Sequence, residues 1–327
     1  MKALVTGGGG FLGSAIARML LERGDEVVVL GRNHYPELEA LGCLGQVADL
    51  GKGPPVLPDD LNVVFHVAAL AGMWGPYERY YEVNVEGTRN ILAAAKRAGV
   101  RRFVYTSSPS VTFHGHDEEN VCEADCSYPS VFPFHYPATK AMAEQEVLAA
   151  NSNDFATTAL RPHLIYGPGD PHLLPRLMAR QKAGRLRRIG DGQNRVAVTY
   201  VDNAAIAHLQ AAEALFGGSK NAGRAYFITD GEPVKCWDWL EEAFVAAGLG
   251  TIDKSISRAT ALRVASVLEW VWRTFSLGGE PPITRFTVEQ VSSSHWYDLS
   301  AAREDFGYTP VVTGEEGFRR MVASLRG

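Results

Sequence analysis

The chain has 327 residues, of which 46% are hydrophobic, and a formal net charge of −5. It is long enough to bury one large core or two modest ones. Its acidic balance lacks the basic excess that nucleic-acid binding requires, so no nucleic-acid partner is expected. Four cysteines are too few for a disulfide framework, and no familiar ligand spacing indicates a metal site.

Neither end of the sequence predicts a targeting or anchoring segment. The start, MKALVTGGGG, reads as a strand and a glycine turn where a signal peptide has its apolar core. The most apolar late segment, 261–277, carries Arg263, Glu269 and Arg273, which argues against a membrane span. We therefore expect a soluble, cytoplasmic protein with at most a peripheral membrane contact.

Short β-rich runs alternate with helical patterns through the first half of the chain. The pattern predicts strands at 3–6, 26–30, 63–66, 103–106 and 157–161, and helices at 11–23, 84–98 and 136–150. Strands separated by helices require right-handed crossovers and a parallel sheet covered on both faces. The predicted fold class is α/β, with a doubly wound parallel sheet.

A glycine-rich turn joins the first strand to the first helix. Residues 4–13 read LVTGGGGFLG and place Gly7, Gly10 and Gly13 at this junction. Glycine permits the tight turn and lets backbone N–H groups approach a pyrophosphate at the positive end of the helix. A glycine-rich run is weak evidence alone, but this strand–helix context is the one that a dinucleotide site requires.

The end of the second strand bears on the choice of cofactor. An NAD site usually has an acid here to hold the adenosine ribose hydroxyls. This sequence has Gly31 followed by Arg32. A small residue leaves room for a 2′-phosphate, and a guanidinium binds it bidentately. The sequence favours NADP(H), with NAD(H) possible; the alternative for Arg32 is an exposed loop residue without this role.

Residues 134–140 read FHYPATK and place Tyr136 and Lys140 four residues apart. On the predicted helix the two side chains share a face, where a phenol and an ammonium would change each other's ionisation. One such match is weak evidence by itself, so its meaning depends on the rest of the chain.

Beyond Pro162 the regular alternation stops, and proline, glycine and arginine become common. Strands are predicted at 196–201 and 225–228, and helices at 201–215 and 237–247. We predict a dinucleotide-binding domain over 1–163, to which 196–228 partly returns. The segments 164–195 and 229–327 are predicted to form a smaller substrate-binding lobe.

Several further motifs accompany the Tyr–Lys pair in a fixed order. They are TGGGGFLG (6–13), ADL (48–50), HVAALAG (66–72), VNVEGTRNIL (83–92), YTSSPSV (105–111), YPATK (136–140) and RPHLIYGP (161–168). Together they cover about half of the chain and resemble the extended short-chain dehydrogenases/reductases, the superfamily of NAD-dependent epimerases and dehydratases. The resemblance implies a Rossmann sheet, an NAD(P)-dependent oxidoreductase and a homodimer joined through the helices 84–98 and 136–150.

The same resemblance implies catalytic roles. Tyr136 would exchange a proton with the substrate carbonyl, and Lys140 would lower the pKa of Tyr136 and bind the nicotinamide ribose. Ser108 would stabilise the charge that develops on the carbonyl oxygen; its neighbour Ser107 matches the family pattern less well. Asn84 corresponds to a residue that orders a water chain near the lysine, the alternative being a surface amide.

The resemblance also extends to the cofactor contacts. Asp49 and Leu50 match residues that flank adenine, and Ala68 and Ala69 match residues along the cofactor. The full set of predicted cofactor-binding residues is Gly7, Gly10, Phe11, Leu12, Gly13, Arg32, Asp49, Leu50, Ala68, Ala69, Tyr136, Lys140 and Pro162.

Two absences argue against a nucleotide-sugar substrate. The segment LRPHLIYGP (160–168) lacks the Asn that often holds a sugar nucleotide's diphosphate, and TSSPSVTF (106–113) lacks the acidic pair of the dehydratases. The apolar segment 261–286 suggests either a contact with a lipid-like ligand or membrane surface, or ordinary core packing with a dimer contact.

These features resemble the branch that holds 3β-hydroxysteroid dehydrogenases and 2-alkyl-3-oxoalkanoate reductases. The leading prediction is NADP(H)-dependent reduction of a ketone on a bulky lipid-like substrate, foremost a long-chain 2-alkyl-3-oxoalkanoate. A 3β-hydroxysteroid or sterol-4-carboxylate dehydrogenase is the first alternative, and a nucleotide-sugar epimerase or dehydratase the second. A cofactor-sensing binding protein is less well supported, because such proteins typically lose the Tyr or the Lys.

Overall fold

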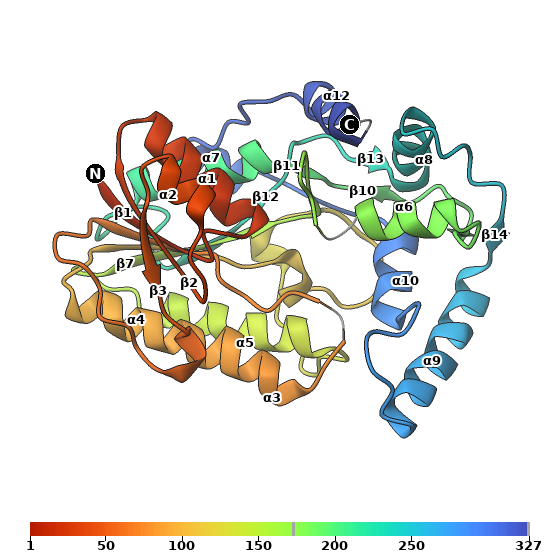
Figure 1. The fold of residues 1–327 in the computed structure, drawn as a ribbon, viewed down its shortest axis with the longest axis horizontal. Coiled ribbons are helices and arrows are strands. Elements are labelled where there is room, and N and C mark those ends of the chain that lie inside the picture. Colours follow the sequence, from red (N-terminus) through yellow and green to blue (C-terminus); the bar gives the residue numbers. More distant parts are fainter. Residues whose placement is uncertain (73, 172–173, 326–327) are drawn as a thin grey trace.

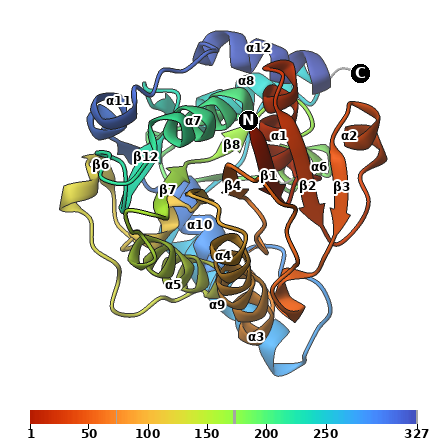
Figure 2. The same ribbon diagram turned by 90° about the vertical axis from the view of Figure 1, so that its left-hand side faces the viewer.

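The computed structural model describes residues 1–72, 74–171 and 174–325. Its centre is a seven-stranded sheet with the strand order β12-β7-β5-β4-β1-β2-β3 and parallel pairing (Figures 1 and 2). The strands are β1 (Lys2–Thr6), β2 (Glu26–Gly31), β3 (Leu44–Val47), β4 (Val63–His66), β5 (Arg102–Thr106), β7 (Ala156–Pro162) and β12 (Arg224–Ile228). The chain winds outward from β1 in both directions, which confirms the predicted doubly wound α/β fold.

Helices cover both faces of this sheet, as Figure 2 shows. One face carries α1 (Phe11–Glu22), α7 (Val201–Ala214) and α11 (Ser300–Phe306). The other carries α3 (Tyr77–Tyr80), the π-helical turn η2 (Tyr81–Glu86), α4 (Gly87–Arg97) and α5 (His135–Ala149). Because both faces are covered, the inner strands are apolar without alternation, and all four residues of β4 are buried.

The remaining elements surround the ends of the sheet and build the smaller lobe. Its strands are β6 (Glu118–Val121), β8 (Ile165–Tyr166), β9 (Arg188–Ile189), β10 (Arg195–Val196), β11 (Thr199–Tyr200), β13 (Val234–Lys235), β14 (Ser255–Ile256) and β15 (His295–Tyr297). Its helices are α6 (Leu174–Lys182), α8 (Cys236–Ala246), α9 (Arg258–Thr274), α10 (Arg285–Ser292) and α12 (Gly314–Leu325). The short elements are α2 (Pro36–Ala40), η1 (Leu50–Lys52), η3 (Pro109–Val111) and η4 (Glu123–Asp125).

A separate apolar core holds the lobe together, built around Trp237, Leu240, Phe244 and Val288. A four-stranded sheet of order β13-β10-β15-β6 forms part of its frame. Among the described residues, none of the helices has the length and apolar character needed to cross a bilayer. The boundaries proposed for the two domains stay a prediction, although β12 does extend the large sheet beside β7.

Two local predictions were wrong. The single strand expected at 196–201 is two short strands, because Ala197 N–H donates to His295 while Thr199 N–H donates to Leu164, so the chain changes partners. The helix expected to begin at Asn84 begins at Tyr77 and contains a π-helical turn before it continues as α4.

Candidate active site

The glycine-rich turn forms a cradle at the start of α1. Gly7 has a φ of 68°, and a Cβ on it would lie 2.8 Å from the Cα of Ala68. Gly10 N–H donates to the carbonyl of Gly7 at 2.9 Å, and a Cβ on Gly13 would collide with the same carbonyl. Side chains are therefore excluded from the turn, and the open helix N-terminus fits a dinucleotide pyrophosphate.

A cavity of about 1040 Å³ begins at this cradle and continues to the lobe. Its wall brings together nearly all of the predicted site residues, from the loops after β1, β2, β3, β4 and β5 and from α1, α5 and β7. They are Gly7, Gly10, Phe11, Leu12, Gly13, Arg32, Asp49, Leu50, Ala68, Ala69, Ser108, Tyr136, Lys140 and Pro162. Asn84 does not belong to the described wall and lies behind it.

Tyr35 is a residue of this wall that the sequence reasoning missed. Its ring lies against the backbone of Gly9 and Gly31, so that a Cβ on either glycine would fall well inside the ring's van der Waals surface. Arg32 is exposed beside it and also lines the cavity. The space directly beside Gly31 that the sequence reasoning assigned to a 2′-phosphate is therefore occupied by the Tyr35 ring, and the Arg32 guanidinium lies next to it.

Tyr136 and Ser108 come from different elements and meet at the wall. Ser108 follows β5, where its hydroxyl forms a hydrogen bond of 2.9 Å with the hydroxyl of Ser110. Tyr136 lies in the first turn of α5. Burial raises the pKa of Tyr136 to about 12, and a hydrogen bond with Ser108 partly opposes this rise. The phenol therefore keeps its proton at neutral pH and can donate it.

Lys140 is buried and points at the carboxyl end of β5. Its Nζ donates to the carbonyl of Thr106 at 2.6 Å and lies 4.1 Å from the centre of the Tyr105 ring. Burial lowers its pKa to about 7, which the Glu144 carboxylate partly opposes. Burial is the largest influence on the pKa of both groups, and the expected lowering of the Tyr136 pKa by Lys140 stays a prediction.

Ser107 presents a second hydroxyl to the cavity. Its N–H donates to the carbonyl of Leu160 at 2.6 Å, which holds the turn after β5 against β7. Its Oγ is buried and has no hydrogen-bond partner in the described part of the chain. An orphaned hydroxyl in a cavity wall is suited to a ligand contact, so both serines of the pair are available to one.

Asn84 lies in the π-helical turn and is buried, which excludes the alternative of a surface amide. Its Oδ1 accepts from Leu70 N–H at 2.7 Å, and its Nδ2 donates to the Thr139 hydroxyl at 3.1 Å. Asn84 thus joins the loop after β4 to α5, one residue before Lys140. The predicted water chain stays a prediction.

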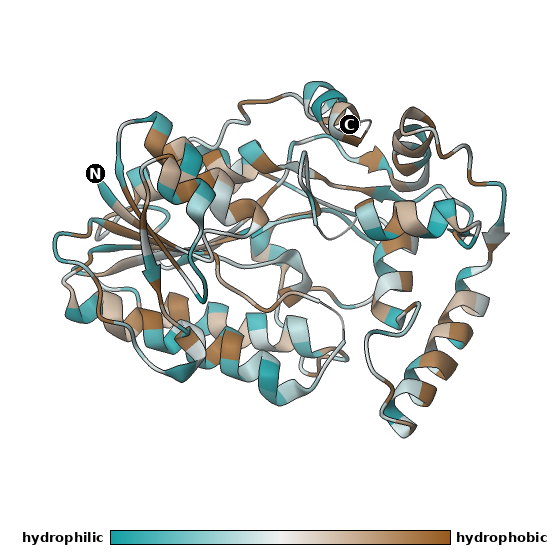
Figure 3. Ribbon diagram, in the orientation of Figure 1, coloured by the Kyte–Doolittle hydropathy of each residue, from teal (hydrophilic) through white to brown (hydrophobic). Residues whose placement is uncertain are grey.

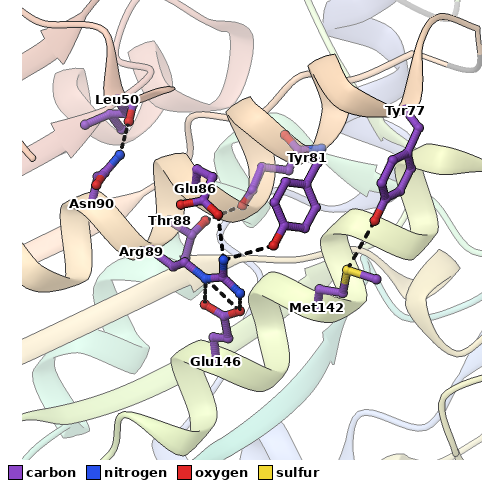
Figure 4. Close-up of polar contacts among 10 residues, drawn as sticks. Leu50, Tyr77, Tyr81, Glu86, Thr88, Arg89, Asn90, Met142 and Glu146 are labelled. Atoms are coloured by element: carbon purple, nitrogen blue, oxygen red, sulfur yellow. Dashed lines mark hydrogen bonds and ion pairs between the residues drawn. The ribbon is translucent and has the colours of Figure 1, made fainter. Parts of the chain in front are cut away.

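Two arginine–glutamate pairs hold α5 in place. Arg161 on β7 donates to Glu144 through Nη2 at 2.6 Å and Nε at 3.0 Å, and both side chains are buried. On the outer side, Arg89 on α4 binds Glu146, with Nε 2.8 Å from Oε2 (Figure 4). These contacts fix the helix that carries Tyr136 and Lys140 against the sheet and against α4.

The lobe contributes a mostly apolar part of the cavity wall, from α6, β10, α8 and the segment before α10. Its apolar members include Leu177, Val196, Val198, Trp239, Leu240, Ile283 and Phe286. Arg180 on α6 is a half-buried cation of this wall that forms no ion pair within the described residues. The lobe part of the wall also holds Arg176, which pairs with Glu280, so among its described residues Arg180 is the cation left to meet the carboxylate of an apolar acid.

A buried histidine pair connects the sheet to the lobe beside this wall. His163, which follows β7, and His295 on β15 form a hydrogen bond of 2.6 Å between Nε2 and Nδ1. His295 Nε2 lies 2.9 Å from the carbonyl of Gln290 and must donate to it. His295 Nδ1 therefore accepts from His163, and burial lowers the pKa of both rings. The sequence reasoning did not foresee this pair.

Comparison with known proteins identifies the family to which the chain belongs. The model of the 3-beta hydroxysteroid dehydrogenase/isomerase family matches residues 4–259. The chain belongs to this family. It is an NAD(P)-dependent oxidoreductase of the extended short-chain dehydrogenase/reductase type, as the sequence motifs predicted.

Individual relatives cover nearly the whole chain. The 2-alkyl-3-oxoalkanoate reductase of Stenotrophomonas maltophilia (strain K279a) is 50% identical over 99% of both chains. The protein of that name from Shewanella oneidensis is 42% identical over 99% of this chain and 86% of its own. The sterol-4-alpha-carboxylate 3-dehydrogenase, decarboxylating, of Homo sapiens is 34% identical over 99% and 88%. MoeE5, solved with UDP-glucose and NAD, superimposes with a TM-score of 0.73 at 25% identity, over 100% of this chain and 99% of its own.

Proposed function

We propose that the protein reduces the ketone of a 2-alkyl-3-oxoalkanoate to the secondary alcohol, with NADPH as the hydride donor. The observation that carries this proposal is the composition of the cavity wall, in which an acid–base set meets an apolar surface with the cation Arg180. A β-keto acid with long alkyl chains offers a carbonyl, apolar chains and a carboxylate to match. The two relatives named 2-alkyl-3-oxoalkanoate reductase support the same substrate class.

Each site residue then has a chemical role. The bound nicotinamide supplies a hydride to the ketone carbon. Tyr136, which is protonated at neutral pH, donates its phenolic proton to the carbonyl oxygen. Ser108 holds the same oxygen by a hydrogen bond as charge develops. Lys140, whose Nζ donates to the Thr106 carbonyl, would hold the nicotinamide ribose.

The preference for NADPH rests on the end of β2. Gly31 occupies the position of the usual acid, and the Tyr35 ring leaves no space for a longer side chain there. Arg32 adds a cation that can pair with a 2′-phosphate. An acid that would hold the 2′-hydroxyl of NAD is missing from residue 31, which supports NADP(H) over NAD(H).

A sterol-4-carboxylate dehydrogenase is the second candidate. Such a substrate also pairs an apolar body with a carboxylate next to the reacting carbon, so Arg180 fits it as well. The relative from Homo sapiens supports this candidate at lower identity. The two functions differ in direction and cofactor, because sterol oxidation would require an oxidised nicotinamide.

Steady-state turnover separates the candidates. Purified protein is assayed with NADPH or NADH and a 2-alkyl-3-oxo acid, and with NADP⁺ or NAD⁺ and a 4-carboxysterol. We expect NADPH-dependent reduction, lowered on the order of 10²–10⁴-fold by Tyr136→Phe. Sterol oxidation without ketone reduction would overturn the proposal in favour of the second candidate.

We also propose a homodimer that pairs α4 and α5 of one copy with those of the other, as the resemblance to extended short-chain dehydrogenases implies. The two helices lie side by side on one face of the sheet (Figure 2). Met142 on α5 is an exposed apolar side chain of that layer. Light scattering coupled to size exclusion should give twice the 35.6 kDa chain mass, and Met142→Arg should shift it toward the monomer. The cytoplasmic location stays a prediction.

A further inference from the structure

A row of buried polar side chains crosses the apolar core at the carboxyl ends of β1 and β4, and the proposed reaction gives its central member no role. That member is His66, the last residue of β4, which is 1% exposed. Hydrophobic residues predominate in the strands around it (Figure 3). The other members of the row, all buried, are Thr6, Asn84, Thr88 and Thr139. Because water does not replace a lost partner in such a core, breaking one of these hydrogen bonds leaves a polar group unsatisfied.

One end of the row holds the loop after β4. His66 Nδ1 lies 2.7 Å from the hydroxyl oxygen of Thr6. That oxygen accepts from the backbone N–H groups of Val67 and Ala68, each at 3.2 Å. Ala68 lines the cavity and is the residue with which a Cβ on Gly7 would collide. Through Thr6, His66 therefore acts on the part of the wall where the dinucleotide is expected.

The other end of the row enters the π-helical turn. His66 Nε2 lies 2.9 Å from the hydroxyl oxygen of Thr88. The Thr88 hydroxyl donates to the backbone carbonyl of Asn84 at 2.6 Å. The Asn84 side chain accepts from the N–H of Leu70, which also lines the cavity. The loop after β4 is therefore held at both of its ends, and His66 joins the two points of attachment.

From Asn84 the contacts continue into α5. Asn84 Nδ2 donates to the hydroxyl oxygen of Thr139. The Thr139 hydroxyl donates in turn to the backbone carbonyls of His135 and Tyr136, at 2.9 and 3.2 Å. Lys140 is the next residue along the chain. The row of hydrogen bonds therefore reaches the first turn of the helix that carries the proton donor.

The direction of each hydrogen bond at His66 is determined. The Thr88 hydroxyl gives its proton to a carbonyl, so His66 Nε2 must donate to the Thr88 oxygen. Burial and the charge of Lys140 lower the pKa of His66 to about 3, so the ring is neutral at neutral pH and its Nδ1 carries no proton. Nδ1 must then accept from the Thr6 hydroxyl. A neutral imidazole supplies one donor and one acceptor at fixed positions, which these two contacts require.

We propose that His66 is a positioning residue that couples the loop 67–70 of the cofactor site to the catalytic helix α5. Its Nδ1 supports binding of the dinucleotide through Thr6, and its Nε2 supports the placement of Tyr136 through Thr88. Core packing alone would need neither nitrogen, because an apolar side chain of similar volume would fill the same space. The inference rests on the proposed reduction only for its catalytic readout.

Two substitutions each keep one half of the histidine. His66→Asn retains an acceptor near the position of Nδ1 and has no donor that reaches Thr88. His66→Gln retains a donor near the position of Nε2 and leaves the Thr6 hydroxyl without its acceptor. Both side chains are polar and uncharged, so each variant is the matched control for the other.

Fluorescence titration gives the dissociation constant of NADPH, and turnover of a 2-alkyl-3-oxo acid at saturating NADPH gives kcat. We expect His66→Gln to raise the dissociation constant about tenfold and to change kcat less than about threefold. We expect His66→Asn to lower kcat about tenfold and to change the dissociation constant less than about threefold. Thr88→Val removes the oxygen that joins His66 to Asn84 and should reproduce the loss of kcat, which keeps the test open if His66→Asn does not fold.

Nitrogen-15 NMR of protein labelled in its histidine rings tests the assigned proton independently of turnover. The His66 resonances are identified by their loss in His66→Gln. They should show a protonated Nε2 and a bare Nδ1 from about pH 5 to pH 8. A proton on Nδ1 in this range would contradict the proposed direction of the hydrogen bonds.

The two binding and turnover readouts can also overturn the coupling. Equal changes of kcat and of the dissociation constant in His66→Asn and His66→Gln would leave His66 with a role in stability alone, and wild-type values in both variants would leave it with none. A wild type that binds NADPH but does not reduce the ketone would refute the proposed substrate. The titration and the NMR measurement would still test His66 in that case.

Discussion

The ring of Tyr35 fills the space in which a side chain on Gly31 would begin. The strand β2 ends there, at the position where an NAD-binding acid is usually placed. Two glycines, Gly9 and Gly31, are needed for this packing, because a Cβ on either would enter the ring. The proposed preference for NADP(H) therefore involves a packing relationship between an aromatic side chain and bare backbone, in addition to the charge of Arg32.

This relationship predicts that an acid at residue 31 acts differently with and without Tyr35. Gly31→Asp alone should weaken binding of both NADPH and NADH, because the new side chain collides with the ring. Gly31→Asp with Tyr35→Ala should restore NADH binding and repel the 2′-phosphate of NADPH. Dissociation constants from fluorescence titration measure both effects. If the Gly31→Asp single variant binds NADH as well as the double variant does, the steric argument is contradicted.

Arg180 is predicted to recognise the substrate carboxylate. Arg180→Met keeps much of the side-chain volume and removes the charge, so kcat/KM for a 2-alkyl-3-oxo acid should fall about 10- to 100-fold. The methyl ester of the same acid is the control substrate, and its kcat/KM should change little. An equal loss for the acid and the ester would assign Arg180 to packing.

The lowered pKa of Lys140 predicts that the difference in stability between the wild type and Lys140→Met depends on pH. Its folded pKa of about 7 lies below the ordinary value of 10.5, so the unfolded chain binds more protons between these two values. The free energy of unfolding contributed at this site therefore rises with pH across that window. Lys140→Met has no such proton, so its stability advantage over the wild type should be largest below pH 7 and shrink toward pH 10.5.

Urea denaturation of both proteins at several pH values measures this difference, in which the titration of all other groups largely cancels. A constant difference from pH 6 to pH 10 would show that Lys140 keeps an ordinary pKa in the folded protein.

Glu144 and Glu146 on α5 each form an ion pair, and comparing their substitutions shows how burial changes the contribution of such a pair to stability. Glu144→Gln leaves Arg161 buried without its partner charge and should cost about 3–5 kcal/mol of unfolding free energy. Glu146→Gln breaks the outer pair with Arg89 (Figure 4), which is partly exposed, and should cost about 0–1 kcal/mol. Chemical denaturation monitored by circular dichroism compares the two. Similar losses of unfolding free energy in the two variants would mean that solvent exposure does not determine how much each ion pair contributes to stability.

Much of the fold was predictable because buried parallel strands and their helices have strong local patterns. The run Val63–His66 is apolar and fully buried as expected, and the glycines at β1–α1 have the close contacts that their spacing implied. The position of Tyr136 and Lys140 on one helix also followed from local spacing.

Features that depend on distant partners were missed. The short strands β10 and β11 exist because His295 and Leu164 accept their hydrogen bonds, which no local pattern shows. Tyr35 lies at the site because its ring packs on the backbone of Gly9 and Gly31. The sequence feature that could have indicated this packing is the lack of side chains at these two positions. The ionisation of Lys140 follows from its burial beneath the cavity, which spacing along a helix does not reveal.

The π-helical turn Tyr81–Glu86 holds one residue more than an α-helix of the same length would. Asn84 reaches Leu70 and Thr139 from within this turn. The extra residue rotates the helix face before the turn relative to the face after it. Deleting one residue here would straighten the helix and carry Tyr77 and Tyr80 about 100° around its axis relative to α4. Length variation at this point would therefore reorient the segment Tyr77–Tyr80, whose Arg79 lines the cavity.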